Sequence, residues 1–106
     1  MIEVLCISDS DKPKEIPLGN WIQKGMIYHI THIHFHHFQA IQGVDLHEVK
    51  LTPECYPYET YRLSRFAINL EQLNKFIQMM KDCTELNDVQ IDELIKESDL
   101  QLIDEE

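Results

Sequence analysis

The chain has 106 residues, of which 43% are hydrophobic and 26% are charged, and its net charge at pH 7 is −10. This composition is typical of one small globular domain and is too apolar for a disordered chain. The negative charge disfavours contact with a phosphate backbone, and no apolar run approaches the ~20 residues of a membrane-spanning helix, so neither a nucleic-acid nor a membrane partner is expected.

The first predicted strand covers residues 2–7, an apolar run that ends at a polar cluster. Residues 8–25 contain prolines and glycines, which predicts a long loop with one helical turn near Trp21. Several side chains of this loop are too apolar for free exposure. We therefore expect Trp21 to fold back over the core, where its large ring supplies contact area.

The second predicted strand covers residues 26–38 and contains most of the histidines. A regular strand places only alternate residues on one face, so the apolar residues Ile30 and Ile33 would lie on opposite faces of a regular strand. One extra residue near Thr31–His32 would restore the pattern. This predicts a β-bulge there, which would bend the strand as a small barrel requires.

The remaining strands are predicted from turn residues and from a second point at which the alternation of apolar residues is interrupted. Residues 39–43 are expected to form a turn, and residues 43–51 a third strand with an irregularity near His47. Residues 52–60 contain two prolines and are expected to form a structured connection. Residues 61–66 are expected to hold a short turn and the start of a last strand.

The sequence changes to a helical period after residue 68. Asn69 followed by Gln72 is a capping signal, and apolar residues then recur at helical spacing up to Met80. Asn87 followed by Gln90 repeats the signal before a second apolar stripe. Two C-terminal helices are therefore predicted, with a connector at residues 82–84.

These elements predict an α+β fold in a single domain of residues 1–106. Residues 1–68 would form a small, bent antiparallel sheet or an SH3-like β-barrel, and residues 69–106 an acidic helical extension. Residues 67–106 contain three basic and eleven acidic residues, a net charge of −8. This charge is typical of a solvated helical face and would also suit a basic protein partner. The helices are further candidates for a homo-oligomer interface.

The predicted strands carry a weak family pattern. Its residues are Val4-x-Cys6-Ile7-x-Asp9, Lys24-Gly25-x-x-Tyr28-x-Ile30-x-x-Ile33 and Ser64-Arg65-Phe66. Over residues 2–68 this pattern resembles a diffuse group of small bacterial and phage proteins with SH3-like β-barrels. The resemblance implies a barrel fold and a phage or mobile-element origin, and it implies no activity.

The histidine-rich strand is the candidate metal site. His32, His34 and His36 alternate along the strand and would point the same way. A further ligand would come from elsewhere, and the candidates are His47 on the next strand, Glu48 and Asp45. Neutral imidazole suits zinc and other transition metals, so a metal cofactor of that class is the alternative to a plain polar surface. A third reading is a pH-responsive surface, because protonated histidines repel one another.

A second cluster combines tyrosines and arginines in a form that suits peptide binding. Its residues are Tyr56, Tyr58, Tyr61, Arg62 and Arg65. SH3-like barrels bind peptides in aromatic-lined grooves, which makes this segment a candidate protein-interaction site. The structural alternative is that Tyr58 and Phe66 close the barrel while the arginines pair with Glu54 or Glu59.

The leading functional prediction is a non-enzymatic protein-interaction module. A cytoplasmic location is expected, because residues 1–7 lack the basic start of a signal peptide. No Gly-x-Ser-x-Gly or glycine-rich phosphate motif is present. The alternative prediction is a metal-binding protein or small metalloenzyme that uses the histidine strand.

Overall fold

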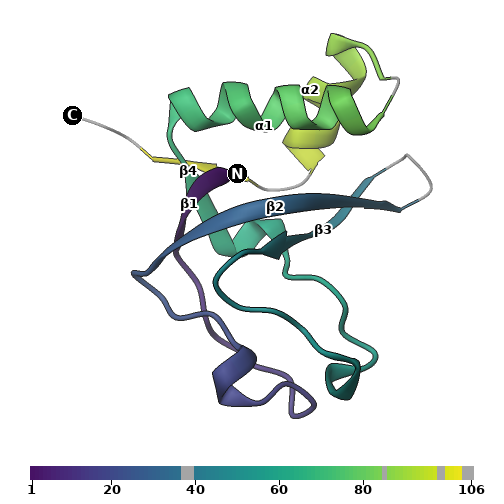
Figure 1. The fold of residues 1–106 in the computed structure, drawn as a ribbon. Helices are drawn as coiled ribbons and strands as arrows, with labels where there is room; N and C mark the ends of the chain where they lie inside the picture. The colour runs from purple at the N-terminus through teal and green to yellow at the C-terminus, as the bar shows by residue number, and fades with distance from the viewer. Residues whose placement is uncertain (37–39, 85, 98–99, 104–106) are drawn as a thin grey trace.

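A computed structural model describes residues 1–36, 40–84, 86–97 and 100–103, and for residues 36, 40, 83 and 97 it describes the backbone without the side chain. Five strands form one curled sheet, a half-barrel, in the order β3-β2-β1-β4-β5 (Figure 1). The strands are β1 (Ile2–Cys6), β2 (Ile27–His36), β3 (Ala40–Leu46), β4 (Phe66–Ile68) and β5 (Gln101–Leu102), and the helices are α1 (Leu70–Cys83) and α2 (Asp88–Glu97).

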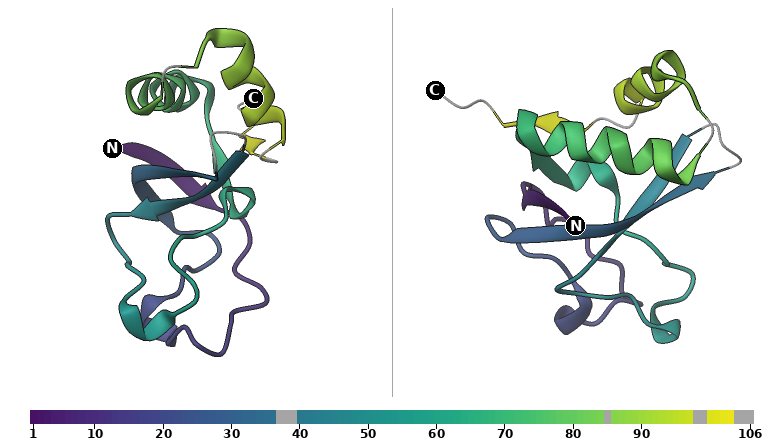
Figure 2. Two further views of the ribbon diagram at one scale, coloured as in Figure 1. Left: turned by 90° about the vertical axis from the view of Figure 1, so that its right-hand side faces the viewer. Right: turned by 45° about the horizontal axis from the view of Figure 1, so that its top comes forward.

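The sheet lies between a layer of helices and a layer of loops. In Figure 1 the two helices lie above the sheet and the long loops hang below it, and both views in Figure 2 show the same separation. The loop layer contains three short 3₁₀ turns, η1 (Leu18–Asn20), η2 (Pro53–Cys55) and η3 (Leu63–Arg65). The acidic helices are therefore at the opposite end of the molecule from the loops.

The predicted α+β class is confirmed, since a strongly bent sheet precedes two C-terminal helices. The sheet is mixed, however, because β5 pairs in parallel with β4 while every other strand pair is antiparallel. A strand of two residues is too short to show a period in the sequence, so this parallel edge was not predicted.

The predicted bulge in β2 is confirmed. Ile30 pairs with Leu46 and His32 pairs with Asp45, so Thr31 is the extra residue of β2. As a result both Ile30 and Ile33 are buried. A second register shift lies between His34 and Phe35 and was not predicted.

The predicted turn at residues 39–43 is wrong for its described part, because β3 already begins at Ala40 and Gly43 pairs with His34. Residues 37–39 lie outside the described residues. Gly43 serves close packing here, since an added Cβ would lie 2.6 Å from the carbonyl oxygen of Tyr61. The third strand likewise ends at Leu46 instead of residue 51, and the phase change near His47 arises because the chain leaves the sheet.

Both helices begin where the capping signals predicted. The Asn69 side chain accepts a hydrogen bond from the Gln72 backbone N–H at 2.9 Å. Asn87 and Gln90 cap each other reciprocally, each side-chain oxygen accepting from the other residue's backbone N–H. Such caps satisfy backbone donors that have no partner in the first helical turn. The helix connector starts later than predicted, because α1 continues to Cys83.

One hydrophobic core joins the three layers. Strand residues such as Val4 and Phe66, the loop residue Trp21, and the helix residues Phe76 and Ile91 belong to a single cluster of buried side chains. Trp21 is buried, as expected for a residue that covers the core. The loop layer is therefore held against the sheet by packing, which fixes the positions of the side chains that it presents to solvent.

Candidate functional site

Two described histidine side chains of β2, His32 and His34, are accessible to solvent. His32 is exposed, and the side chain of His34 keeps 38% of its surface accessible. Their ring centroids lie 5.5 Å apart, so the two imidazoles are neighbours as alternation along a strand predicted. For His36 the structure describes only the backbone, which pairs with Ala40.

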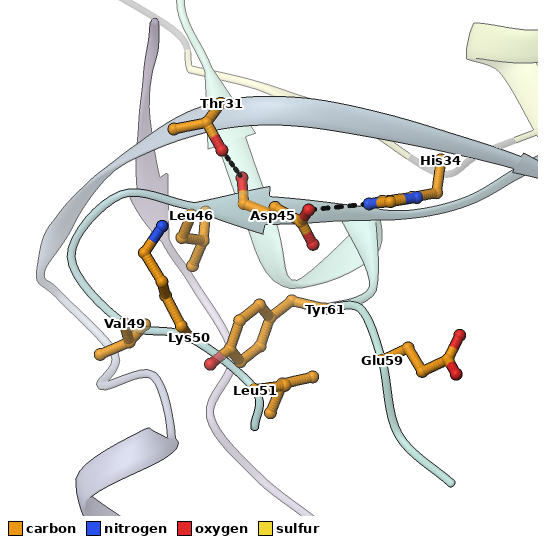
Figure 3. A pocket seen from close by; sticks show the side chains of 9 residues that line it. All are labelled: Thr31, His34, Asp45, Leu46, Val49, Lys50, Leu51, Glu59 and Tyr61. Carbon is orange, nitrogen blue, oxygen red and sulfur yellow. Dashed lines mark hydrogen bonds and ion pairs between the residues drawn. The ribbon is translucent and has the colours of Figure 1, made fainter. Parts of the chain in front are cut away.

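His34 is held by a carboxylate of the neighbouring strand. Its Nε2 lies 2.8 Å from Oδ2 of Asp45, a hydrogen bond that Figure 3 shows from close by. The pair borders a pocket of about 220 Å³, which we call the His34 pocket. Lys50, Glu59 and Tyr61 also line it. This contact fixes the orientation of the ring and leaves its Nδ1 without a partner among the described residues.

The predicted metal set is brought together only in part. His47 is exposed and its backbone N–H donates to the carbonyl of His29, but its side chain makes no hydrogen bond, ion pair or ring contact with a described residue. Among the side chains that the structure describes, no group of three or more His, Cys, Asp or Glu residues is placed to hold a metal ion. Of the predicted metal ligands, only His32 and His34 are therefore seen as neighbours, and the side chain of His36 lies outside the described part of the structure.

His29 forms a second histidine–carboxylate pair on the same strand. Its backbone N–H donates to Oε1 of Glu48 at 2.8 Å, and its Nδ1 lies 2.5 Å from Oε2. Burial by itself raises the pKa of Glu48, but the two hydrogen bonds from His29, the backbone N–H of Glu48 itself and the charge of His29 together outweigh burial and hold this pKa below its ordinary value. The ionised Glu48 therefore ties the chain after β3 to β2.

The lowered pKa of Glu48 predicts a loss of stability in acid. The folded state favours the ionised carboxylate, so its contribution is complete above the ordinary pKa of about 4.3 and is lost as the pH falls through the lower folded value. Urea unfolding of the wild type and of Glu48→Gln from pH 7 to pH 3 should show a stability gap that narrows below about pH 4.3. A gap that stays constant down to pH 3 would contradict this account.

The tyrosines of the second cluster have different environments. Tyr56 and Tyr58 keep 75% and 41% of their surface exposed, whereas Tyr61 keeps 3%. The Tyr61 hydroxyl donates to the carbonyl of Asn20 at 2.6 Å, and burial raises its pKa well above the ordinary value. Tyr61 is therefore a structural hydrogen-bond donor, and the two exposed tyrosines are the ones that a ligand can reach.

The two arginines also differ. The guanidinium of Arg65 lies 4.9 Å from the ring centroid of Trp21, and its Nη1 donates to the carbonyl of Ser10 at 2.7 Å. Arg62 is exposed and makes no hydrogen bond or ion pair through its side chain with any described residue. The predicted pairing with Glu54 or Glu59 is therefore not found among the described residues. Arg65 instead contacts Ser10 and Trp21 of the first loop.

The five residues of this cluster line two adjoining pockets. The Tyr56 pocket has a volume of about 450 Å³ and is bordered mainly by Leu51, Pro53, Tyr56 and Tyr58. The Arg62 pocket has a volume of about 220 Å³ and is bordered by Trp21, Tyr58, Tyr61, Arg62, Arg65 and Asp11, among others. Because Tyr58 belongs to both, the pockets are neighbours. We call their combined surface the loop face.

Sequence reasoning found the tyrosines and arginines but missed the other walls of the loop face. Leu51 was assigned to a strand, and Asp11 and Trp21 belong to a loop that lies about forty residues away in sequence. The one available signal was the unusual apolarity of the first loop, which indicated that it packs on the core. Nothing local indicates which part of the second loop it meets.

Comparison of the chain with protein-family models, with curated proteins and with solved structures found no match. None of the described helices is long and apolar enough to cross a membrane. The function is therefore inferred from the geometry of the loop face and of the histidine strand.

Proposed function

We propose that this chain is a non-enzymatic protein-interaction module that binds an extended segment of a partner protein across the loop face. One observation supports it: two exposed tyrosines, and an arginine whose side chain has no partner among the described residues, line adjoining pockets. Tyrosine and arginine are among the residues that most often dominate the binding energy of protein interfaces. The three residues are Tyr56, Tyr58 and Arg62.

The loop face is also held in place before a partner arrives. Tyr61 and Arg65 connect the second loop to the first through hydrogen bonds to Asn20 and Ser10, and both side chains lie against Trp21. A surface that is already ordered loses less conformational entropy on binding, which favours affinity. These contacts support a framework role for Tyr61 and Arg65, and a binding role for the exposed residues of the loop face.

The test starts from an unbiased library of linear peptides selected against the full chain. Recovered peptides are then titrated by fluorescence anisotropy into the wild type and into two variants. Tyr58→Ala should weaken binding at least about tenfold, or about 1.4 kcal/mol, because Tyr58 borders both pockets. The control Val89→Ala removes an exposed apolar side chain of α2 and should leave binding unchanged. Recovery of no binder, or of binders indifferent to Tyr58→Ala, would contradict the proposal.

Transition-metal binding at the histidine strand is the second candidate that we propose. The adjacent rings of His32 and His34 favour it, as does Asp45, which occupies Nε2 of His34. A carboxylate on one ring nitrogen commonly orients the other toward a metal. A metal would then bind through Nδ1 of His34 together with His32, and further ligands would be needed to complete a tetrahedral zinc site.

Calorimetric titration of the untagged protein with zinc chloride tests this second candidate. The expected result is a saturable site with one zinc per chain that His34→Ala abolishes. His47→Ala is the matched control, because that exposed histidine has no described contact with His32 or His34. Absence of saturable binding, or equal binding by His34→Ala and the wild type, would rule out the metal site.

A further inference from the structure

The loop face offers a partner two chemically different pockets. The charged residues that line the Arg62 pocket are two arginines, Arg62 and Arg65, and one acidic residue, Asp11. In the Tyr56 pocket, the single charged residue is Glu59, and the rest of the lining is mainly aromatic and aliphatic. An acidic group of a ligand is therefore favoured in the Arg62 pocket and disfavoured in the Tyr56 pocket.

Of the two arginines that line the Arg62 pocket, Arg62 is the one whose side chain makes no hydrogen bond or ion pair with a described residue. Its backbone carbonyl accepts a hydrogen bond from the Arg65 N–H at 3.2 Å, which anchors the residue at the start of η3. Its guanidinium has no partner among the described residues, whereas that of Arg65 is already engaged by Ser10 and Trp21. A guanidinium presents paired N–H donors that match a carboxylate, so Arg62 is suited to bind one in a bidentate manner.

The distribution of charge permits an acidic ligand despite the net charge of −10. Residues 1–66 contain six basic and eight acidic residues, a net charge of only −2. The strongly acidic helices lie on the other side of the sheet from the long loops (Figure 1). Exposed charges are largely screened beyond a Debye length of about 8 Å at physiological salt. Repulsion from the helices is therefore weak at the loop face.

We infer that the loop face selects a partner segment in which a carboxylate side chain lies beside an aromatic or aliphatic side chain. This inference rests on the proposed function of the loop face. The carboxylate pairs with Arg62, and the apolar side chain enters the Tyr56 pocket between Tyr56, Tyr58 and Leu51. The two groups must be close in the segment, because Tyr58 borders both pockets.

The test uses the peptides recovered from the unbiased library. Most of them should contain Asp or Glu next to, or within a few residues of, an aromatic or aliphatic residue. Arg62→Glu should weaken their binding at least about tenfold, and replacing the peptide's acidic residue with Lys should restore binding to that variant. Lys75→Glu makes the same charge change at an exposed site on α1 and should have little effect.

The outcomes separate this inference from the proposed function. Peptides that need Tyr58 but contain no acidic residue, and that bind Arg62→Glu as well as the wild type, would overturn the carboxylate selection and leave the loop face as the binding site. Peptides that are indifferent to both Tyr58→Ala and Arg62→Glu would overturn both. Loss of binding in Arg62→Glu that the charge-swapped peptide does not rescue would also overturn the pairing, because a direct contact must be reversible in this way.

Discussion

Replacing Phe76 with alanine is expected to destabilise the whole protein by about 3–5 kcal/mol, the usual cost of removing a buried phenylalanine ring. Phe76 projects from α1 and keeps 0% of its surface exposed, in the same core as Phe66 of β4. Small domains are stable by only about 5–15 kcal/mol, so this loss should leave a large unfolded fraction at moderate temperature. The helices are thus predicted to be part of the fold and not an independent attachment.

Urea unfolding followed by two probes can check this. Far-ultraviolet circular dichroism reports on the helices, and the fluorescence of Trp21 reports on the loop layer at the other side of the sheet. The two transitions should coincide in the wild type and move together in Phe76→Ala. Val89→Ala, an exposed change on α2, should move them by no more than about 0.5 kcal/mol. A Trp21 transition unaffected by Phe76→Ala would show that the helices do not support the half-barrel.

Replacing Gly43 with alanine is expected to destabilise the protein by about 1–3 kcal/mol, the usual cost of forcing extra volume into a packed site. The added Cβ would lie 2.6 Å from the backbone oxygen of Tyr61, which cannot move aside as a flexible side chain could. Val44 and Tyr61 exchange two backbone hydrogen bonds of 2.9 and 3.0 Å directly beside this point. The strain should therefore loosen the segment that supports Arg62 and Tyr58.

Gly19→Ala is the matched control, because an added Cβ there meets nothing within 4 Å. Thermal unfolding should separate the two variants clearly. Native-state hydrogen exchange should also show faster exchange of the Val44 and Tyr61 amides in Gly43→Ala. Equal stability of both variants would mean that the second loop does not pack against β3 as described.

Local patterns predicted those parts of the fold that local forces determine. The capping residues Asn69 and Asn87 correctly predicted where both helices begin, and the spacing of the buried residues Ile30 and Ile33 correctly predicted the bulge. Gly43 was misinterpreted as a turn residue because its role depends on a contact with Tyr61, which lies eighteen residues later in the sequence. Packing between distant segments of this kind leaves no periodic signal in a single sequence.

The same limit applies to the candidate site. The tyrosines and arginines are close in sequence, so their clustering could be predicted. The sequence did not show which of them are held by contacts inside the protein and which are exposed. Arg65 was expected to pair with a nearby glutamate, and instead it contacts Trp21 and Ser10 of the first loop. Only the folded chain shows that the Arg62 side chain has no such partner in the part of the chain that the structure describes.

The central claim is that a partner segment binds at the loop face, and amide chemical shifts measured during a titration test it most directly. The isotope-labelled full chain is titrated with the tightest peptide from the unbiased selection. Shift changes should concentrate at residues 51–65 and at the Trp21 indole, with α1 and α2 unaffected. Changes confined to the acidic helices, or to the histidines of β2, would contradict the claim and move the binding site there.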